Sequence, residues 1–164
     1  MKNITFFLCI SVIVLFISGC NSSTIDEELD IFQYKNSYVG DNGAVGKITR
    51  QLPNPNGEQL NGLELKTTEE LYGIILNYSQ VETNDSIEID YNELALTNAT
   101  LILALVTNAD WVQFNFVEKE LIVTREELQN LYGKDIRQFN DEEKLRNFIQ
   151  EQLENEHKVN EFFY

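Results

Sequence analysis

The residues of this 164-residue chain best suited to bind a ligand lie in a glycine-rich stretch that leads into a predicted helix. Backbone N–H groups at such a helix start attract anions, so a phosphate-binding loop is the first function to consider. Its pattern, G-x-x-x-x-G-K-[ST], fails because Asp41 replaces the first glycine and Ile48 replaces the hydroxyl residue. We expect instead that the glycines allow positive φ in a tight turn and that Asp41 or Asn42 caps the helix. The residues of this candidate binding turn are Tyr38, Gly40, Asp41, Asn42, Gly46 and Lys47.

Catalytic residue types are sparse. The single histidine, His157, falls near the end of a charged helix, and neither G-x-S-x-G nor S-x-x-K occurs. With 27 Asp and Glu residues, some carboxylate pair for the hydrolysis of wall polymers is arithmetically inevitable, but no spacing singles out two of them. The same oxygens suit a cation, although no EF-hand loop is present. We expect no catalysis, no cofactor and no dedicated metal site. A carboxylate hydrolase and a cation- or small-ligand-binding protein are the alternatives.

The charge balance narrows the choice of partners. Twelve Lys and Arg residues against the 27 acidic residues give a formal net charge of −15. Binding to nucleic acid depends on basic side chains that neutralise phosphates, so we expect no nucleic acid partner. Two cysteines and one histidine are also too few for a zinc site built from thiolates and imidazoles.

The amino-terminal residues have the pattern of an export signal. One lysine, Lys2, precedes fourteen uncharged and mostly apolar residues (4–17), fewer than the roughly 20 that a membrane-spanning helix needs. Residues 17–20, Ile-Ser-Gly-Cys, resemble the lipobox of bacterial lipoproteins. The resemblance implies that residues 1–19 are a cleaved signal peptide and that Cys20 carries a diacylglyceryl anchor. The chain would then be held at the cell membrane, facing outside the cytoplasm. The alternative is an uncleaved anchor with Cys20 as an ordinary cysteine beside the membrane.

The remainder reads as a tether and one α+β domain. Residues 20–30 begin with the cysteine and are otherwise mostly polar and acidic, which suits a short tether. We expect residues 31–164 to form the domain. Capping boxes, in which a small polar residue is followed three residues later by Glu, predict helices over 90–108, 124–132 and about 140–157. Apolar side chains surround most of the 90–108 helix, which predicts a central buried helix, with a membrane span as the alternative. The three capping pairs are Asp90 with Glu93, Thr124 with Glu127, and Asn140 with Glu143.

Four strands are expected, and they come in two pairs. Residues 60–66 and 71–78 form the first pair, although Thr67 and Glu70 also permit a helix over 71–78. Residues 111–117 and 120–124 alternate around a two-residue turn and predict a hairpin. We therefore expect a small antiparallel sheet packed against the helices.

Several motifs together resemble a known family. Residues 34–42, Tyr-Lys-Asn-Ser-Tyr-Val-Gly-Asp-Asn, are followed by Val-Gly-Lys-Ile at 45–48 and Leu-Pro at 52–53. Further similarity lies at 71–74, 94–108, 124–128 and 132–134. The pattern resembles a domain of unknown function found in Firmicute lipoproteins and membrane-anchored proteins, over roughly residues 30–150. The resemblance implies an extracytoplasmic domain with no established activity and no catalytic residues.

A binding role is the function that these observations favour. Seven tyrosines, one tryptophan and ten phenylalanines are many for a small core, and tyrosine suits interfaces because its large apolar ring carries one polar end. The last residues, 160–164, either fold back onto the sheet or stay exposed for a partner. We expect a lipid-anchored binding or interaction module, attached to the membrane through Cys20, that meets an exported or membrane protein.

Overall fold

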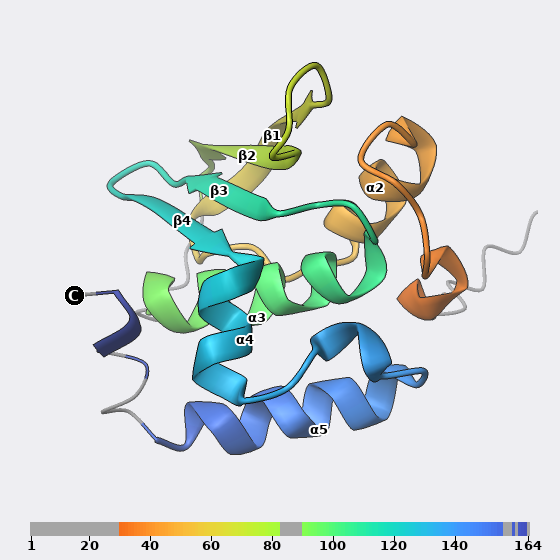
Figure 1. Ribbon diagram of the computed structural model, residues 1–164. Coiled ribbons are helices and arrows are strands. Elements are labelled where there is room, and N and C mark those ends of the chain that lie inside the picture. Colours follow the sequence, from red (N-terminus) through yellow and green to blue (C-terminus); the bar gives the residue numbers. More distant parts are fainter. Residues whose placement is uncertain (1–29, 83–89, 156–158, 160, 164) are drawn as a thin grey trace, which may run out of the picture.

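The computed structural model describes residues 30–82, 90–155, 159 and 161–163, and within them one four-stranded sheet packs against helices (Figure 1). Helices α3, α4 and α5 all lie on the same side of the sheet in Figure 1. This arrangement confirms the α+β class. The elements in chain order are η1 (Ile31–Tyr34), α2 (Asn42–Arg50), β1 (Glu58–Lys66), β2 (Gly73–Gln80), α3 (Tyr91–Leu105), β3 (Trp111–Asn115), β4 (Glu120–Thr124), α4 (Arg125–Tyr132), η2 (Ile136–Gln138) and α5 (Glu142–Leu153).

The sheet is mixed, which corrects the expectation of a purely antiparallel one. The pairs β1–β2 and β3–β4 are antiparallel as expected, but β2 and β3 run parallel, with Ile74 opposite Val112 and Leu76 opposite Phe114. The reason is the connection between them. Helix α3 crosses one face of the sheet and returns the chain to the end at which β2 begins. The next strand, β3, therefore runs in the same direction as β2. Residues 73–80 form a strand, not the helix that Thr67 and Glu70 permitted.

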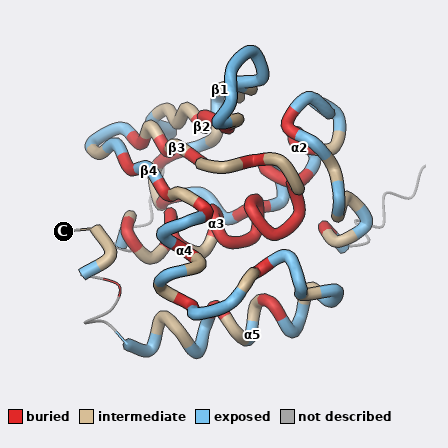
Figure 2. Tube along the Cα trace, viewed as in Figure 1, coloured by how far each residue is buried: buried red, intermediate tan, exposed pale blue. Residues whose placement is uncertain are grey.

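Helix α3 is the central buried helix that the sequence predicts. Asp90 caps it by accepting a hydrogen bond from the backbone N–H of Asn92 at 2.7 Å. From Leu94 to Leu105 all but one of its side chains are buried, and Figure 2 shows this helix as a red band between the sheet and α5. It ends three residues before the predicted end, at Leu105. In the described part of the chain no helix is long and apolar enough to cross a membrane.

The boundaries of α4 agree with the sequence, and those of α5 differ. Thr124 and Glu127 form both bonds of a capping box, and Gly133 ends α4 with φ of 66°. The predicted cap of α5 at Asn140 is wrong, because Asp141 accepts from the N–H of Lys144 at 2.9 Å instead. The charged carboxylate interacts more favourably than an amide with the positive end of the helix dipole. Helix α5 ends at Leu153, before the expected residue 157, and His157 lies outside the described residues.

Apolar side chains of α5 and of the carboxyl-terminal segment complete the core. Leu145 and Ile149 of α5 are buried. Phe162 and Phe163 are half-buried and pack against the core, so this part of the tail folds back. Tyr164 lies outside the described residues.

Candidate binding surface around residues 106–110

Asp41 and its neighbours form the helix start that the sequence predicts. The Asp41 carboxylate accepts from the N–H of Ala44 at 3.0 Å and caps α2. The N–H of Asp41 donates to Tyr38 O at 2.9 Å, and that of Asn42 donates to Gly40 O at 3.1 Å. These N–H groups are therefore already used within the chain, and the turn is not arranged to bind an anion.

The glycines of this turn do not have the positive φ that we expected. Among the described residues, positive φ occurs at Asn36 (65°), Gly57 and Gly133, and not at Gly40 or Gly46. A four-residue turn closed by a bond between residues three apart, as from Asp41 to Tyr38, has negative φ at both central residues in its commonest type. The single left-handed residue nearby is Asn36, a type that tolerates this conformation.

The remaining predicted site residues separate into packed and exposed ones. Gly46 is buried within α2, and the ammonium of Lys47 lies 5.5 Å from the centroid of the Tyr34 ring. Tyr38 is 60% exposed. Tyr38 is therefore the member of the predicted turn whose large side chain is free to contact a partner. Cys20 lies outside the described residues.

The backbone on both sides of Tyr38 is fixed by the loop after α3, residues 106–110. Thr107 N–H donates to Ser37 O at 2.8 Å, and Val39 N–H donates to the side-chain oxygen of Asn108, also at 2.8 Å. Val39 itself is fully buried. The exposed tyrosine ring thus stands on a backbone held at the residue before it and the residue after it.

The same loop also holds the start of β2. Asp110 N–H donates to Tyr72 O at 2.8 Å, and its carboxylate accepts from Tyr72 N–H at 3.0 Å. The preceding residue, Leu71, is 68% exposed. Loop 106–110 therefore fixes the backbone next to two exposed side chains on separate segments, and we call Tyr38 and Leu71 the loop-anchored pair.

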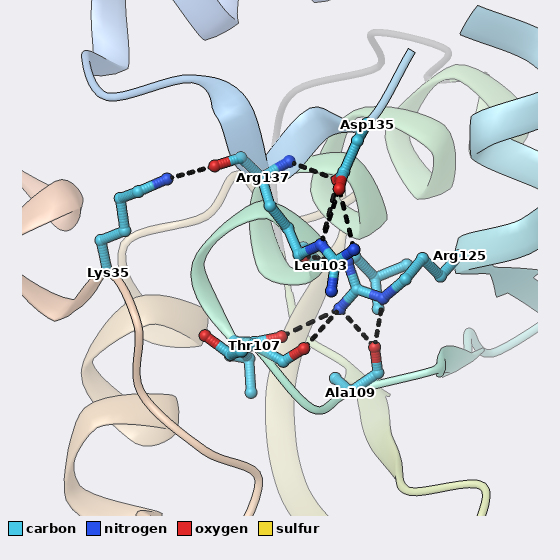
Figure 3. A network of polar contacts seen from close by, with 8 residues as sticks. Lys35, Leu103, Thr107, Ala109, Arg125, Asp135 and Arg137 are labelled. Atoms are coloured by element: carbon cyan, nitrogen blue, oxygen red, sulfur yellow. Dashed lines mark hydrogen bonds and ion pairs between the residues drawn. The ribbon is translucent and has the colours of Figure 1, made fainter. Parts of the chain in front are cut away.

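A buried arginine holds the loop itself. The guanidinium of Arg125 donates from Nη1 to Leu103 O at 2.7 Å, from Nη2 to Val106 O at 3.0 Å and from Nε to Ala109 O at 2.9 Å (Figure 3). The last carbonyls of a helix have no partner within the helix, and its carboxyl-terminal end attracts positive charge. Arg125 supplies both the donors and the charge. Its planar group reaches several carbonyls at once, which the single ammonium of a lysine does not do.

Charged neighbours influence the pKa of Arg125 in opposite directions. Burial, together with the nearby Arg137, lowers the pKa of Arg125 to about 10, and Asp110 and Asp135 oppose this change. Asp135 pairs with Arg137 at 2.8 Å, and this hydrogen bond lowers the pKa of Asp135 and raises that of Arg137. The carbonyl of Arg137 in turn accepts from Lys35 Nζ at 2.7 Å. The network joins η1, α4 and η2 around loop 106–110.

Residue-level reasoning on the sequence missed this network. In the sequence, Arg125 belongs to the segment 124–128 that carries part of the family resemblance, and Asn108 is the last residue of the helix predicted over 90–108. The sequence does contain one indication that Arg125 has a partner elsewhere in the fold. Arg125 is the first residue of a capped helix, a position where acidic residues are favoured and a basic one is unfavourable. A cation at that position indicates a partner outside its own helix.

The acidic side chains offer little for catalysis or metal binding in the described part of the chain. Glu58 is the acidic residue that is buried there, and its two oxygens accept from the hydroxyl of Tyr91 and, at 3.0 Å, from Val117 N–H. Within residues 30–82 and 90–155 and the few described after them, no three His, Cys, Asp or Glu side chains are placed to hold a metal ion.

The fold and this network define an α+β domain with an arginine-held loop beside one end of its sheet. The chain belongs to the family of the domain of unknown function DUF4825, which matches residues 31–127. That match includes the candidate turn, loop 106–110 and Arg125, and it leaves α5 outside. No curated protein and no solved structure matches the chain.

Proposed function

We propose that this protein is a lipid-anchored, extracytoplasmic binding module that recognises an exported or membrane protein through the loop-anchored pair. The observation that carries the proposal is that Tyr38 and Leu71 are 60% and 68% exposed on backbone fixed by loop 106–110. A large side chain held on rigid backbone loses little conformational freedom on binding, and aromatic residues are common among those that dominate the energy of interfaces.

The membrane attachment rests on residues 1–20. The apolar run at 4–17 and the Ile-Ser-Gly-Cys sequence that follows it support lipidation of Cys20. Two acyl chains on this cysteine would anchor the protein stably, whereas one would not. Cys20→Ser should abolish incorporation of labelled palmitate and release the chain from the membrane fraction. Retention of the label in that variant would contradict the lipid anchor.

Crosslinking in intact cells tests the binding surface. We compare the parent with the double variant Tyr38→Ala/Leu71→Ala, and with Val117→Ala as the matched control. Val117 is also a large exposed apolar residue, at 48%, and it follows β3 at the end away from Trp111. We expect the double variant to lose a crosslinked partner that the parent and Val117→Ala retain. Identical crosslinked partners in all three proteins would overturn the assignment of this surface.

A further inference from the structure

The face of the sheet opposite α3 carries an ordered row of polar side chains. Along β3, Val112 and Phe114 are buried in the core, and the alternate residues Gln113 and Asn115 therefore point to the other face. Figure 1 shows α3, α4 and α5 all on the core side, so none of these three helices covers this second face. We call it the outer face.

A chain of hydrogen bonds crosses three strands on the outer face. Gln113 donates to Asn115 at 2.8 Å, and Asn115 donates to Asn77 of β2 at 2.7 Å. Asn77 donates to Glu64 of β1 at 3.3 Å. An amide has two donor hydrogens and an oxygen with two lone pairs, so Asn77 and Asn115 each keep one donor and one lone pair for a ligand. We call Gln113, Asn115 and Asn77 the amide row.

An aromatic ring lies beside the amide row. The indole of Trp111 lies against Gly73 so closely that a Cβ on the glycine would fall 2.1 Å from the ring. Its Nε1 donates to Leu71 O at 3.1 Å, which fixes the orientation of the ring, and Trp111 stays half-buried. Ile75 follows Gly73 by two residues on β2, pairs with Gln113 across the strands and is 9% exposed.

The charge of this surface differs from that of the whole chain. Its carboxylate next to the amide row, Glu64, pairs with Lys66 at 2.8 Å, and the three amides and the indole are neutral. Glu120 lies beside Asn115 at the border of the face. In a protein with a net charge of −15, this surface has one ion pair and one further carboxylate at its border, so its low net charge suits an uncharged, hydrogen-bonding ligand.

We propose that the outer face binds a neutral carbohydrate chain. The flat ring of Trp111 would stack on the C–H face of one sugar, and the amide row would bond pairs of hydroxyl groups on the next. Apolar contact with a few placed polar groups is the usual composition of a small-ligand site, and groups already fixed by their own bonds lose little freedom on binding. This site adjoins the loop-anchored pair at Leu71, whose carbonyl oxygen accepts from Trp111 Nε1, but it uses different side chains.

The single tryptophan of the chain makes the test specific, because its fluorescence reports on Trp111 alone. Full-length protein in detergent micelles is titrated with the tetramer of N-acetylglucosamine and, in parallel, with cellotetraose. We expect a saturable change in emission with at least one of them. Gln113→Ala and Asn115→Ala should each weaken binding by about tenfold or more, while Tyr38→Ala should bind as the parent does.

Circular dichroism of each variant separates a lost site from a lost fold, and calorimetry repeats the measurement without the fluorophore. The absence of both heat and emission change at millimolar sugar would overturn the proposal. Binding that persists in folded Gln113→Ala/Asn115→Ala would also overturn it. Either failure leaves the crosslinking result at Tyr38 and Leu71 unaffected, so the two proposals fail separately.

Discussion

The Nη1 atom of Arg125, at the start of α4, donates to the carbonyl oxygen of Leu103, near the end of α3, at 2.7 Å. One side chain therefore closes the carboxyl-terminal end of the central helix from a different element. The same guanidinium bonds the carbonyls of Val106 and Ala109, and loop 106–110 in turn holds Tyr38 and Leu71 through their neighbours. Arg125 thus connects the core to the proposed partner surface.

Replacing Arg125 by Met should destabilise the protein by at least about 3 kcal/mol, because each buried carbonyl left without a donor costs about 1–3 kcal/mol. Arg125→Lys should lose less, since the ammonium keeps the charge but reaches fewer carbonyls. Urea unfolding followed by circular dichroism measures both. A Met variant as stable as the parent would refute the role of Arg125 as a cap.

The cap of α2 can be tested with a pair of substitutions at one position. Asp41→Ala should cost about 1 kcal/mol, because the Ala44 N–H loses its acceptor, whereas Asp41→Asn keeps a capping oxygen and should cost less. Thermal unfolding measures the difference. Equal losses in the two variants would mean that the charge of Asp41, and not its hydrogen bond, stabilises the helix.

Two glycines should differ in how much stability they lose on replacement by alanine. Gly73→Ala places a methyl group where the Trp111 ring lies, so the ring must move and we expect a loss of about 1–3 kcal/mol with a shift in tryptophan emission. Gly40 has open space at its Cβ position and lacks positive φ, so Gly40→Ala should change stability by less than about 0.5 kcal/mol. An unchanged emission spectrum in Gly73→Ala would contradict the packing of the ring on this glycine.

Stability should fall at alkaline pH through three tyrosines. Burial raises the pKa of Tyr78 and of Tyr132 to about 12, and a hydrogen bond to Glu58 raises that of Tyr91 to about 12. Because the folded-state pKa exceeds the unfolded value of about 10, the stabilisation is complete below pH 10 and is lost as the pH rises towards 12.

Absorbance of tyrosinate, recorded with circular dichroism, checks this prediction. Three of the seven tyrosines should ionise late and together with unfolding, and Tyr91→Phe should remove one of them. In urea all tyrosines should titrate near their ordinary pKa. Ionisation of all seven tyrosines near pH 10 with the fold intact would contradict the environments described for Tyr78, Tyr91 and Tyr132.

Short-range features were predictable because neighbouring residues determine them. The capping box of Thr124 and Glu127, the end of α4 at Gly133 and the hairpin between β3 and β4 each depend on residues a few positions apart. Even so, the predicted cap of α5 was Asn140 and the observed cap is Asp141. Either of these adjacent residues can cap a helix, and only the hydrogen bonds in the structure distinguish them. The expected positive φ at Gly40 failed for a similar reason, since a glycine permits that conformation without requiring it.

Taken by itself, the amino-acid sequence determined the α+β class, the buried central helix and the acidic character, because these depend on composition and local periodicity. The prediction of a lipid anchor at Cys20 came from the resemblance of residues 17–20 to a lipobox. Tertiary structure decided the parallel pairing of β2 with β3, the bonds from Arg125 to the end of α3 and the placing of Trp111 on Gly73. These contacts join residues that are 22 to 38 positions apart in the chain. No local pattern specifies such contacts, because they form only when α3 packs across the sheet and brings its two ends beside other elements.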